Sequence, residues 1–269
     1  MINMPKENNI KLIVTDLDGT FLNENSSISD YNKKVFQSLM KKGIEIILST
    51  GRPFNGMKRY KNMIENDNHS IVFNGAVIAD TNGNFIYNKV MDSSTSKSIC
   101  ALYNKYDVYL HVYSGGRYIV SEPDFYYKRY IEREKITDAI VGLDNVNDFE
   151  FSKMVFIGDR DKLEKLQDEI RNNFNVHTSF SHTNFLEVLA YGINKGNALE
   201  WLCNKKRIKR EEVIAFGDNY NDIEMIEYAG IGVAVKNAEE EVKRKADYIC
   251  LTNNEDGVGR FLEDFFSLK

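Results

Sequence analysis

The sequence has few cysteines and no long apolar run. Its three cysteines, Cys100, Cys203 and Cys250, are far apart and form no CxxC pair, which favours free thiols in a reducing compartment. No stretch approaches the length of a transmembrane helix. Met1–Asn9 is polar and lacks the apolar segment of a secretory signal. We therefore expect a cytoplasmic protein that does not associate with a membrane.

The sequence also lacks an excess of basic residues. It has 35 Lys and Arg against 40 Asp and Glu, a net charge of −5, so a broad nucleic-acid-binding surface is not expected. There is no GxGxxG after an expected strand and no GxxxxGK[ST], which excludes the usual signatures of dinucleotide and P-loop nucleotide binding. The 269 residues, 42% of them hydrophobic, suffice for one large or two smaller globular domains.

Two carboxylates lie two residues apart at the end of an apolar run. Asp16-Leu17-Asp18-Gly19-Thr20 follows Lys11–Thr15, and residues i and i+2 of a strand point the same way. Such carboxylates repel each other unless a cation lies between them. The pattern suits a phosphoryl-transfer site; the alternative is a solvated turn built on Asp18-Gly19.

Three further polar segments come at the ends of expected strands or at the start of a helix. Ser49–Arg52 follows the apolar run Ile44–Leu48, and Gly217–Asp222 follows Val213–Phe216. Asn194–Asn197 opens a helical pattern. Strands that alternate with helices predict a doubly wound parallel sheet, in which the carboxyl ends of the strands converge on one binding edge.

These four segments, in this order, resemble the four motifs of the haloacid dehalogenase superfamily of phosphatases. The stretch between the second and third motifs resembles the α/β cap domain of the Cof-type branch, and its own pattern predicts a separate antiparallel sheet with helices. The resemblance implies an α/β fold with a Rossmann-like core of residues 1–84 and 190–269. The inserted cap would comprise residues 85–189.

The resemblance also implies catalytic roles. Asp16 would be the nucleophile that forms an aspartyl-phosphate, and Asp18 would protonate the leaving oxygen and then activate water. Thr50 and Lys195 complete the catalytic set. A Mg²⁺ ion would be held by Asp16, Asp218 and the backbone carbonyl of Asp18, since Mg²⁺ prefers oxygen ligands.

Residues of the same motifs are expected to bind the substrate phosphate: Leu17, Thr50, Gly51, Arg52, Lys195 and Asn221. Asp222 would support the site by orienting Lys195 or metal-bound water. Three of these residues also have an ordinary structural interpretation. Lys195 could be a surface lysine, Arg52 could pair with a nearby acid, and Asp222 could be an acid in the first turn of a helix.

The sequence therefore predicts a Mg²⁺-dependent phosphatase acting on a small-molecule phosphate ester. Sugar phosphates are favoured, with pyridoxal phosphate and flavin mononucleotide as alternatives by family analogy. Two other functions stay open: a phosphomutase of the same superfamily, and a non-catalytic ligand sensor on the same fold. None of the catalytic carboxylates is missing, which argues against the sensor. Nothing in the sequence specifies an oligomeric state.

Overall fold

The structure is a computed structural model, which describes residues 10–134, 139–143, 146 and 148–268. The polar segment Met1–Asn9 lies outside the described residues. Contacts divide the chain into two compact units. The first, here called the catalytic unit, comprises the chain up to Arg52, Met57–Ile86 and the chain from Asn194 onward. The second, called the cap unit, comprises Pro53–Gly56 and Tyr87–Ile193.

The catalytic unit is built on an eight-stranded sheet of order β14-β13-β12-β1-β2-β3-β4-β5. The strands from β14 to β3 are parallel, while β4 runs antiparallel to β3. The parallel sheet is therefore extended at one edge by the β4–β5 hairpin. The strands are β1 (Leu12–Asp16), β2 (Glu45–Ser49), β3 (Ser70–Val72), β4 (Val77–Ala79), β5 (Phe85–Asn88), β12 (Val213–Gly217), β13 (Ile231–Val235) and β14 (Tyr248–Cys250).

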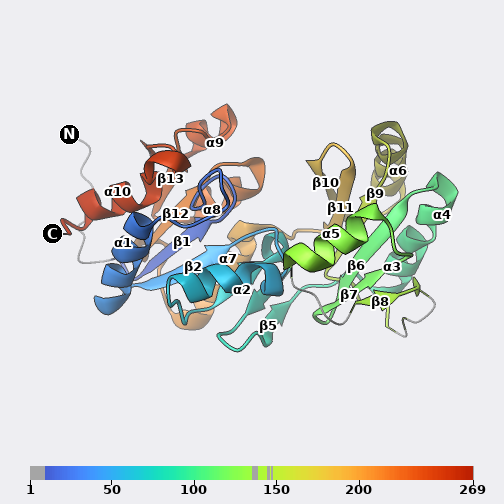
Figure 1. Cartoon of the computed structure of the whole chain (residues 1–269), viewed down its shortest axis with the longest axis horizontal. Coiled ribbons are helices and arrows are strands. Elements are labelled where there is room, and N and C mark those ends of the chain that lie inside the picture. The colour runs from blue at the N-terminus through green and yellow to red at the C-terminus, as the bar shows by residue number, and fades with distance from the viewer. Residues whose placement is uncertain (1–9, 135–138, 144–145, 147, 269) are drawn as a thin grey trace. The chain divides into compact units, whose positions relative to one another are not determined.

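Helices cover this sheet (Figure 1), so its central strands need no polar alternation. Every residue of β1 is buried, as expected of a strand covered on both faces. The first helix is capped by Ser29, whose side chain accepts a hydrogen bond from the backbone N–H of Asn32. The main helices are α1 (Asp30–Lys41), α2 (Phe54–Met63), α7 (Lys195–Lys206), α8 (Ile223–Tyr228), α9 (Glu240–Lys245) and α10 (Gly257–Phe265).

The cap unit contains a six-stranded sheet of order β10-β11-β9-β6-β7-β8. The sequence predicted an antiparallel sheet, and this is wrong for one pair, because β7 and β8 run parallel. Helix α5 (Phe125–Glu134) connects these two strands, and a helical crossover returns the chain in the same direction. The strands are β6 (Tyr109–Ser114), β7 (Arg117–Val120), β8 (Ile140–Val141), β9 (Lys153–Ile157), β10 (Val176–His182) and β11 (Phe185–Ala190).

The two faces of the cap sheet differ in polarity. One face is apolar and includes buried Val112 and Phe156; the unit also has helices α3 (Ser93–Cys100), α4 (Leu102–Tyr106) and α6 (Arg160–Asn173). The other face carries a buried hydrogen-bonded network of side chains, in which His111 contacts Asp124 at 3.1 Å and the Tyr118 hydroxyl at 2.7 Å. Each of these side chains has a hydrogen-bond partner, so the network can be buried without a large penalty.

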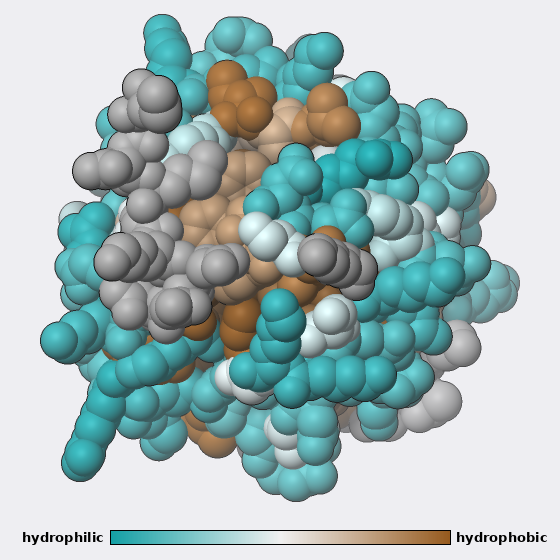
Figure 2. Space-filling model, turned by 90° about the vertical axis from the view of Figure 1, so that its left-hand side faces the viewer, coloured by the Kyte–Doolittle hydropathy of each residue, from teal (hydrophilic) through white to brown (hydrophobic). Residues whose placement is uncertain are grey.

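The face of the molecule drawn in Figure 2 is mostly hydrophilic, with a smaller apolar area. Ile249 of edge strand β14, and Leu251 directly after that strand, are exposed apolar residues. Within the described residues, no helix has the length and apolar character needed to cross a membrane. Cys100, Cys203 and Cys250 are free thiols.

Candidate active site

The acidic and hydroxyl residues of the motifs lie at the carboxyl end of the catalytic sheet. Asp16 is the last residue of β1, and its neighbour in β2 is Ser49. Asp218 directly follows β12, and Thr50 directly follows β2. Because β12, β1 and β2 are adjacent parallel strands, their ends bring these side chains to one edge of the sheet.

Lys195 is fully buried between two carboxylates. Its Nζ donates to Asp16 Oδ1 and to Asp222 Oδ1, both at 2.6 Å. The side chain of Lys195 is 0% exposed, which excludes its interpretation as an ordinary surface lysine. The residue begins α7, capped by Asn194. The next residue, Gly196, allows close packing, since a Cβ there would lie 2.4 Å from the Glu224 carbonyl oxygen.

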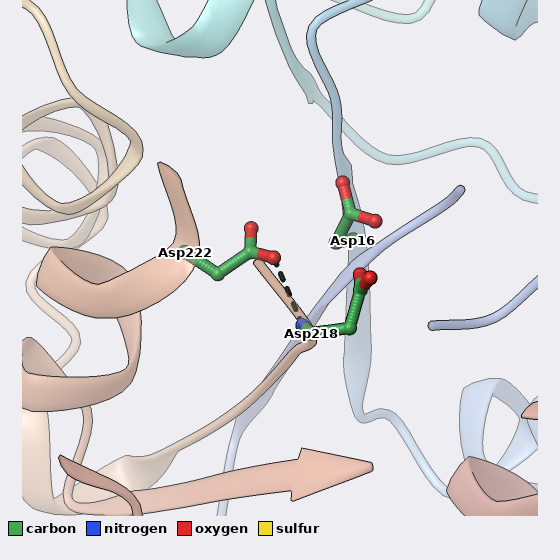
Figure 3. A group of neighbouring side chains, drawn as sticks. All are labelled: Asp16, Asp218 and Asp222. Carbon is green, nitrogen blue, oxygen red and sulfur yellow. Dashed lines mark hydrogen bonds between the residues drawn. The ribbon is translucent and has the colours of Figure 1, made fainter. Parts of the chain in front are cut away.

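Asp222 is held from both sides. One oxygen accepts from Lys195, and the other accepts from the backbone N–H groups of Asp218 at 3.0 Å and Asn219 at 3.1 Å. Figure 3 shows the bond to Asp218, with the carboxylates of Asp16 and Asp218 close by. Asp222 therefore fixes both the lysine and the loop that carries Asp218.

Negative charge exceeds positive charge in this cluster. Burial, reinforced by the charges of Asp222 and Asp218, raises the pKa of Asp16 well above its ordinary value, although Lys195 opposes the shift. Burial and the charge of Asp222 raise the pKa of Asp218 to about 6. Burial alone would lower the pKa of Lys195, but the charges of Asp16 and Asp222 raise it above its ordinary value. The lysine therefore stays charged, and its single ammonium lies among three carboxylates.

The donor set fits a hard divalent cation. Asp16, Asp218 and Asp222 each place a carboxylate oxygen within 4.8 Å of the others. Both oxygens of Asp222 are already engaged, so Asp16 and Asp218 are the carboxylates better able to accept a metal. All the donors are oxygens, which Mg²⁺ prefers, and a cation would offset the repulsion that raises their pKa values.

The Asp18 carboxylate pairs with Arg52. The Arg52 guanidinium donates from Nε to Asp18 Oδ2 and from Nη2 to Asp18 Oδ1, both at 2.7 Å. Arg52 also lies over the Tyr60 ring, with its Cζ 5.4 Å from the centroid. The pairing of Arg52 with a nearby acid, one of its two expected interpretations, is thus the arrangement observed.

The remaining predicted residues lie around the same edge. Thr50 is buried, and its Oγ1 accepts from the backbone of Arg52 at 3.2 Å. Leu17 is fully buried, and Gly51 is partly exposed. Asn221 is exposed, and its Nδ2 donates to Asn74 Oδ1 at 2.9 Å.

Sequence reasoning did not assign a role to two residues of this region. Thr20 Oγ1 donates to Asp218 Oδ1 at 2.6 Å and so orients that carboxylate. In the sequence, only the position of Thr20 inside the first motif pointed to such a role. Asn74 contacts Asn221 across 147 positions of the chain, and only the Asn74-Gly75 pair, which suggests a turn, marked it in the sequence.

Comparison with known proteins identifies the family. The sequence profile of the haloacid dehalogenase-like hydrolases matches residues 13–262. A Bacillus subtilis protein named 5-amino-6-(5-phospho-D-ribitylamino)uracil phosphatase YcsE is 34% identical over 93% of this chain and 94% of its own length. A second B. subtilis phosphatase with the same named activity, YitU, is 29% identical over 96% of this chain and 98% of its own length.

A solved structure shows the same fold. The crystal structure of a haloacid dehalogenase-like hydrolase from Bacteroides thetaiotaomicron superposes with a TM-score of 0.85 at 32% identity, over 96% of this chain and all of its own. The predicted α/β class, a haloacid dehalogenase core with a cap, is thereby confirmed. The chain belongs to the haloacid dehalogenase-like hydrolases, in the Cof-type branch. It is a phosphatase of that family, acting on phosphorylated small molecules.

Proposed function

We propose that this chain is a Mg²⁺-dependent phosphatase that hydrolyses small phosphorylated metabolites through an aspartyl-phosphate on Asp16. The observation that carries the proposal is the buried Lys195 ammonium, 2.6 Å from Asp16 and 2.6 Å from Asp222, beside Asp218. A structural ion pair needs one carboxylate for one lysine. A cluster with surplus carboxylates suits a site that receives a cation and a phosphate.

The proposed first step is attack of Asp16 on phosphorus. Lys195 holds Asp16 Oδ1, which fixes the carboxylate relative to the incoming phosphate. Phosphoryl transfer depends mainly on positioning and on neutralising charge. Lys195 supplies a fixed positive charge for both the nucleophile and the phosphate oxygens. Thr50, Gly51 and Asn221 would donate to those oxygens from the neighbouring loops, and the buried Leu17 would present its backbone amide.

Asp18 would donate a proton to the leaving oxygen. Both of its oxygens are held by Arg52, so the acid role requires that this ion pair opens. A substrate phosphate is itself a bidentate partner for a guanidinium. In our proposal the phosphate takes over Arg52, and Asp18 then turns toward the leaving oxygen. This assigns both expected roles to Arg52, one before and one after substrate binds.

Asp16 and Asp218 would hold the Mg²⁺ ion, with the Asp18 backbone carbonyl as a further ligand. When bound, Mg²⁺ would neutralise the carboxylates and stabilise negative charge on the phosphate. Thr20, through its bond to Asp218 Oδ1, would leave the other oxygen of that carboxylate for the metal.

For the substrate, sugar phosphates remain the favoured class. Two similar B. subtilis proteins are named for a substrate that carries a phosphorylated ribityl chain, and a polyhydroxylated chain of that kind resembles an open sugar phosphate. The same compound is therefore the second candidate to be tested, followed by pyridoxal phosphate and flavin mononucleotide. The cap unit, for which residues 85–189 were predicted, would supply the selectivity.

The test is a screen of these compounds for released phosphate, with Mg²⁺ and after exhaustive chelation. The proposal predicts turnover of single substrates without a bisphosphate activator, which separates it from a mutase. It also predicts an acid-stable mass increase of one phosphoryl group on the peptide containing Asp16 after rapid quenching. Full activity after chelation contradicts the metal assignment. Turnover without any phosphorylated Asp16 contradicts the covalent route.

A further inference from the structure

The turn after β3 has an unusual backbone. Phe73, Asn74 and Gly75 have φ values of +52°, +54° and +97°. Residues with a side chain rarely adopt positive φ, and a bulky one such as Phe least of all. Strained backbone of this kind persists where surrounding contacts hold it, and it concentrates at functional sites.

The surrounding contacts come from the loops of the active site. The backbone N–H of Asn74 donates to the Thr50 carbonyl at 3.1 Å, and that of Phe73 donates to the Arg52 carbonyl at 3.2 Å. On the other side, a Cβ at Gly75 would lie 2.2 Å from the Asn194 carbonyl oxygen, directly before Lys195. The turn therefore fits between the second and third motifs, which explains why its unusual backbone is maintained.

The Asn74 side chain reaches the fourth motif. Its Oδ1 accepts from Asn221 Nδ2 at 2.9 Å. The same carboxamide lies against Gly51, where an added Cβ would be 2.9 Å from Asn74 Oδ1. One side chain thus fixes the direction of the Asn221 amide and occupies the space above Gly51.

We propose that Asn74 is a positioning residue of the phosphatase reaction, which holds the Asn221 amide in the direction needed to donate to the substrate phosphate. The inference rests on the proposed function, in which Asn221 binds that phosphate. It adds a residue outside the four motifs. Asn74 itself acts through Asn221 and forms no bond to phosphorus or to the metal.

The principal test is Asn74→Gly, because glycine keeps the positive φ but removes the carboxamide. With p-nitrophenyl phosphate, kcat/KM should fall by up to about 100-fold, the effect of a small misplacement of a binding group. The inhibition constant of inorganic phosphate should rise, while the melting temperature stays near that of the wild type.

The matched control is Asn66→Ala. This removes another buried asparagine contact, Nδ2 to the Ile46 carbonyl, and should lower stability without changing kcat/KM of the folded enzyme.

Coupling with Asn221 separates positioning from a merely structural role. Residues that act as one unit give non-additive losses, so Asn74→Gly combined with Asn221→Ala should lose no more than the worse single variant. Additive losses in this double variant, or a kcat/KM within twofold of wild type for folded Asn74→Gly, would overturn the proposal.

A second variant covers the case in which Asn74→Gly does not fold. Gly51→Ala keeps the residues of the turn but would place a methyl group 2.9 Å from Asn74 Oδ1, so the carboxamide must shift. It should reproduce the rise in the inhibition constant of phosphate, and Asn221→Ala should again mask it. A Gly51→Ala enzyme with unchanged phosphate inhibition also overturns the proposal. Failure of the proposed function has a different signature, since wild-type protein would then release no phosphate or Asp16→Asn would stay active.

Discussion

A buried lysine forms an ion pair in each unit, and the two sites differ in the number of carboxylates around the lysine. In the cap sheet, Lys153 pairs with Glu187 at 2.7 Å, with both side chains under a tenth exposed. In the catalytic unit, Lys195 meets Asp16 and Asp222 at 2.6 Å, and Asp218 adds a third carboxylate. In the cap contact, one ammonium meets one carboxylate. In the catalytic cluster, one ammonium meets two carboxylates with a third close by, and in our proposal this surplus of negative charge receives a cation.

The two clusters also lie at different places in their sheets. Lys153 and Glu187 project from the faces of adjacent cap strands, since β9 and β11 pair directly. Asp16 and Asp218 lie at the carboxyl ends of strands, where parallel sheets bind ligands. A buried pair within a sheet is satisfied by its neighbours. A substrate can reach a cluster at the strand ends and can supply further partners for its side chains.

The largest expected effect is that of Asp16→Asn. The amide keeps the size of the carboxylate but cannot attack phosphorus, so phosphatase activity should be abolished while the fold is retained. Steady-state release of phosphate measures the loss, and the control is Asp264→Asn at an exposed position of α10. Retention of more than a few per cent of the wild-type rate would contradict the assignment of the nucleophile.

Asp18→Asn should give a loss that depends on the substrate. A positioned acid contributes about 10²–10⁴-fold, but only where the leaving oxygen needs a proton. The decrease in kcat/KM should therefore be larger for a sugar phosphate than for p-nitrophenyl phosphate. Equal decreases with both substrates would argue that Asp18 is not the general acid.

Lys195→Ala should lower kcat by about 10²–10³-fold, the contribution of one preorganised charged donor. The direct counterpart in the cap is Lys153→Met, which should reduce stability but spare activity on p-nitrophenyl phosphate. Parallel kinetics and thermal unfolding of the two variants test the comparison. If Lys153→Met loses as much kcat as Lys195→Ala, the two clusters do not differ in the way proposed.

Asp218→Asn should stabilise the metal-free protein, a change smaller in free energy than the losses of activity above. The pKa of Asp218 is raised to about 6 from an ordinary 3.8, so the native state binds this proton more tightly than the unfolded state does. Stability therefore falls as the pH rises from 3.8 through 6, and it stays lower above that range.

Removing the carboxylate charge should consequently raise the free energy of unfolding near neutral pH by on the order of 1–3 kcal/mol. Chemical denaturation in a chelator, between acid and neutral pH, should show the gap between variant and wild type opening over that interval. Added Mg²⁺ should narrow the gap by stabilising only the wild type. A constant gap at every pH would show that Asp218 is not under electrostatic strain.

The smallest effect is expected when both partners of the cap pair are replaced by apolar residues. Replacing a buried ion pair by residues of similar volume is often neutral or stabilising. Lys153→Met combined with Glu187→Leu should therefore leave the melting temperature close to that of the wild type, whereas either single change should lower it. A double variant as unstable as the single variants would mean that this pair has a further role beyond mutual neutralisation.

The sequence predicted the elements that depend on local pattern. The run Lys11–Thr15 became β1, which spans Leu12–Asp16, and Ser29, a residue type that favours helix N-caps, caps α1. Gly115-Gly116, two glycines that allow the positive φ of a tight turn, join β6 and β7 in a hairpin. Helices α3 and α4 (93–100 and 102–106) were missed. Their serine-rich and tyrosine-rich sequences have low helix propensity, so packing within the cap outweighs local preference there.

What the sequence by itself determined is the set of motifs, their order and their places at strand ends, because hydrophobic periodicity and chain direction fix where a strand stops. Apart from the contact of Lys195 with Asp222, which the family resemblance led us to expect, tertiary structure decided the partners of the side chains. Arg52 holds Asp18 across 34 positions, and Asn74 holds Asn221 across 147. Lys195 is buried between Asp16 and Asp222 rather than solvated. Such contacts depend on which strands become neighbours in the sheet, and no local pattern records the distance between two residues far apart in the chain.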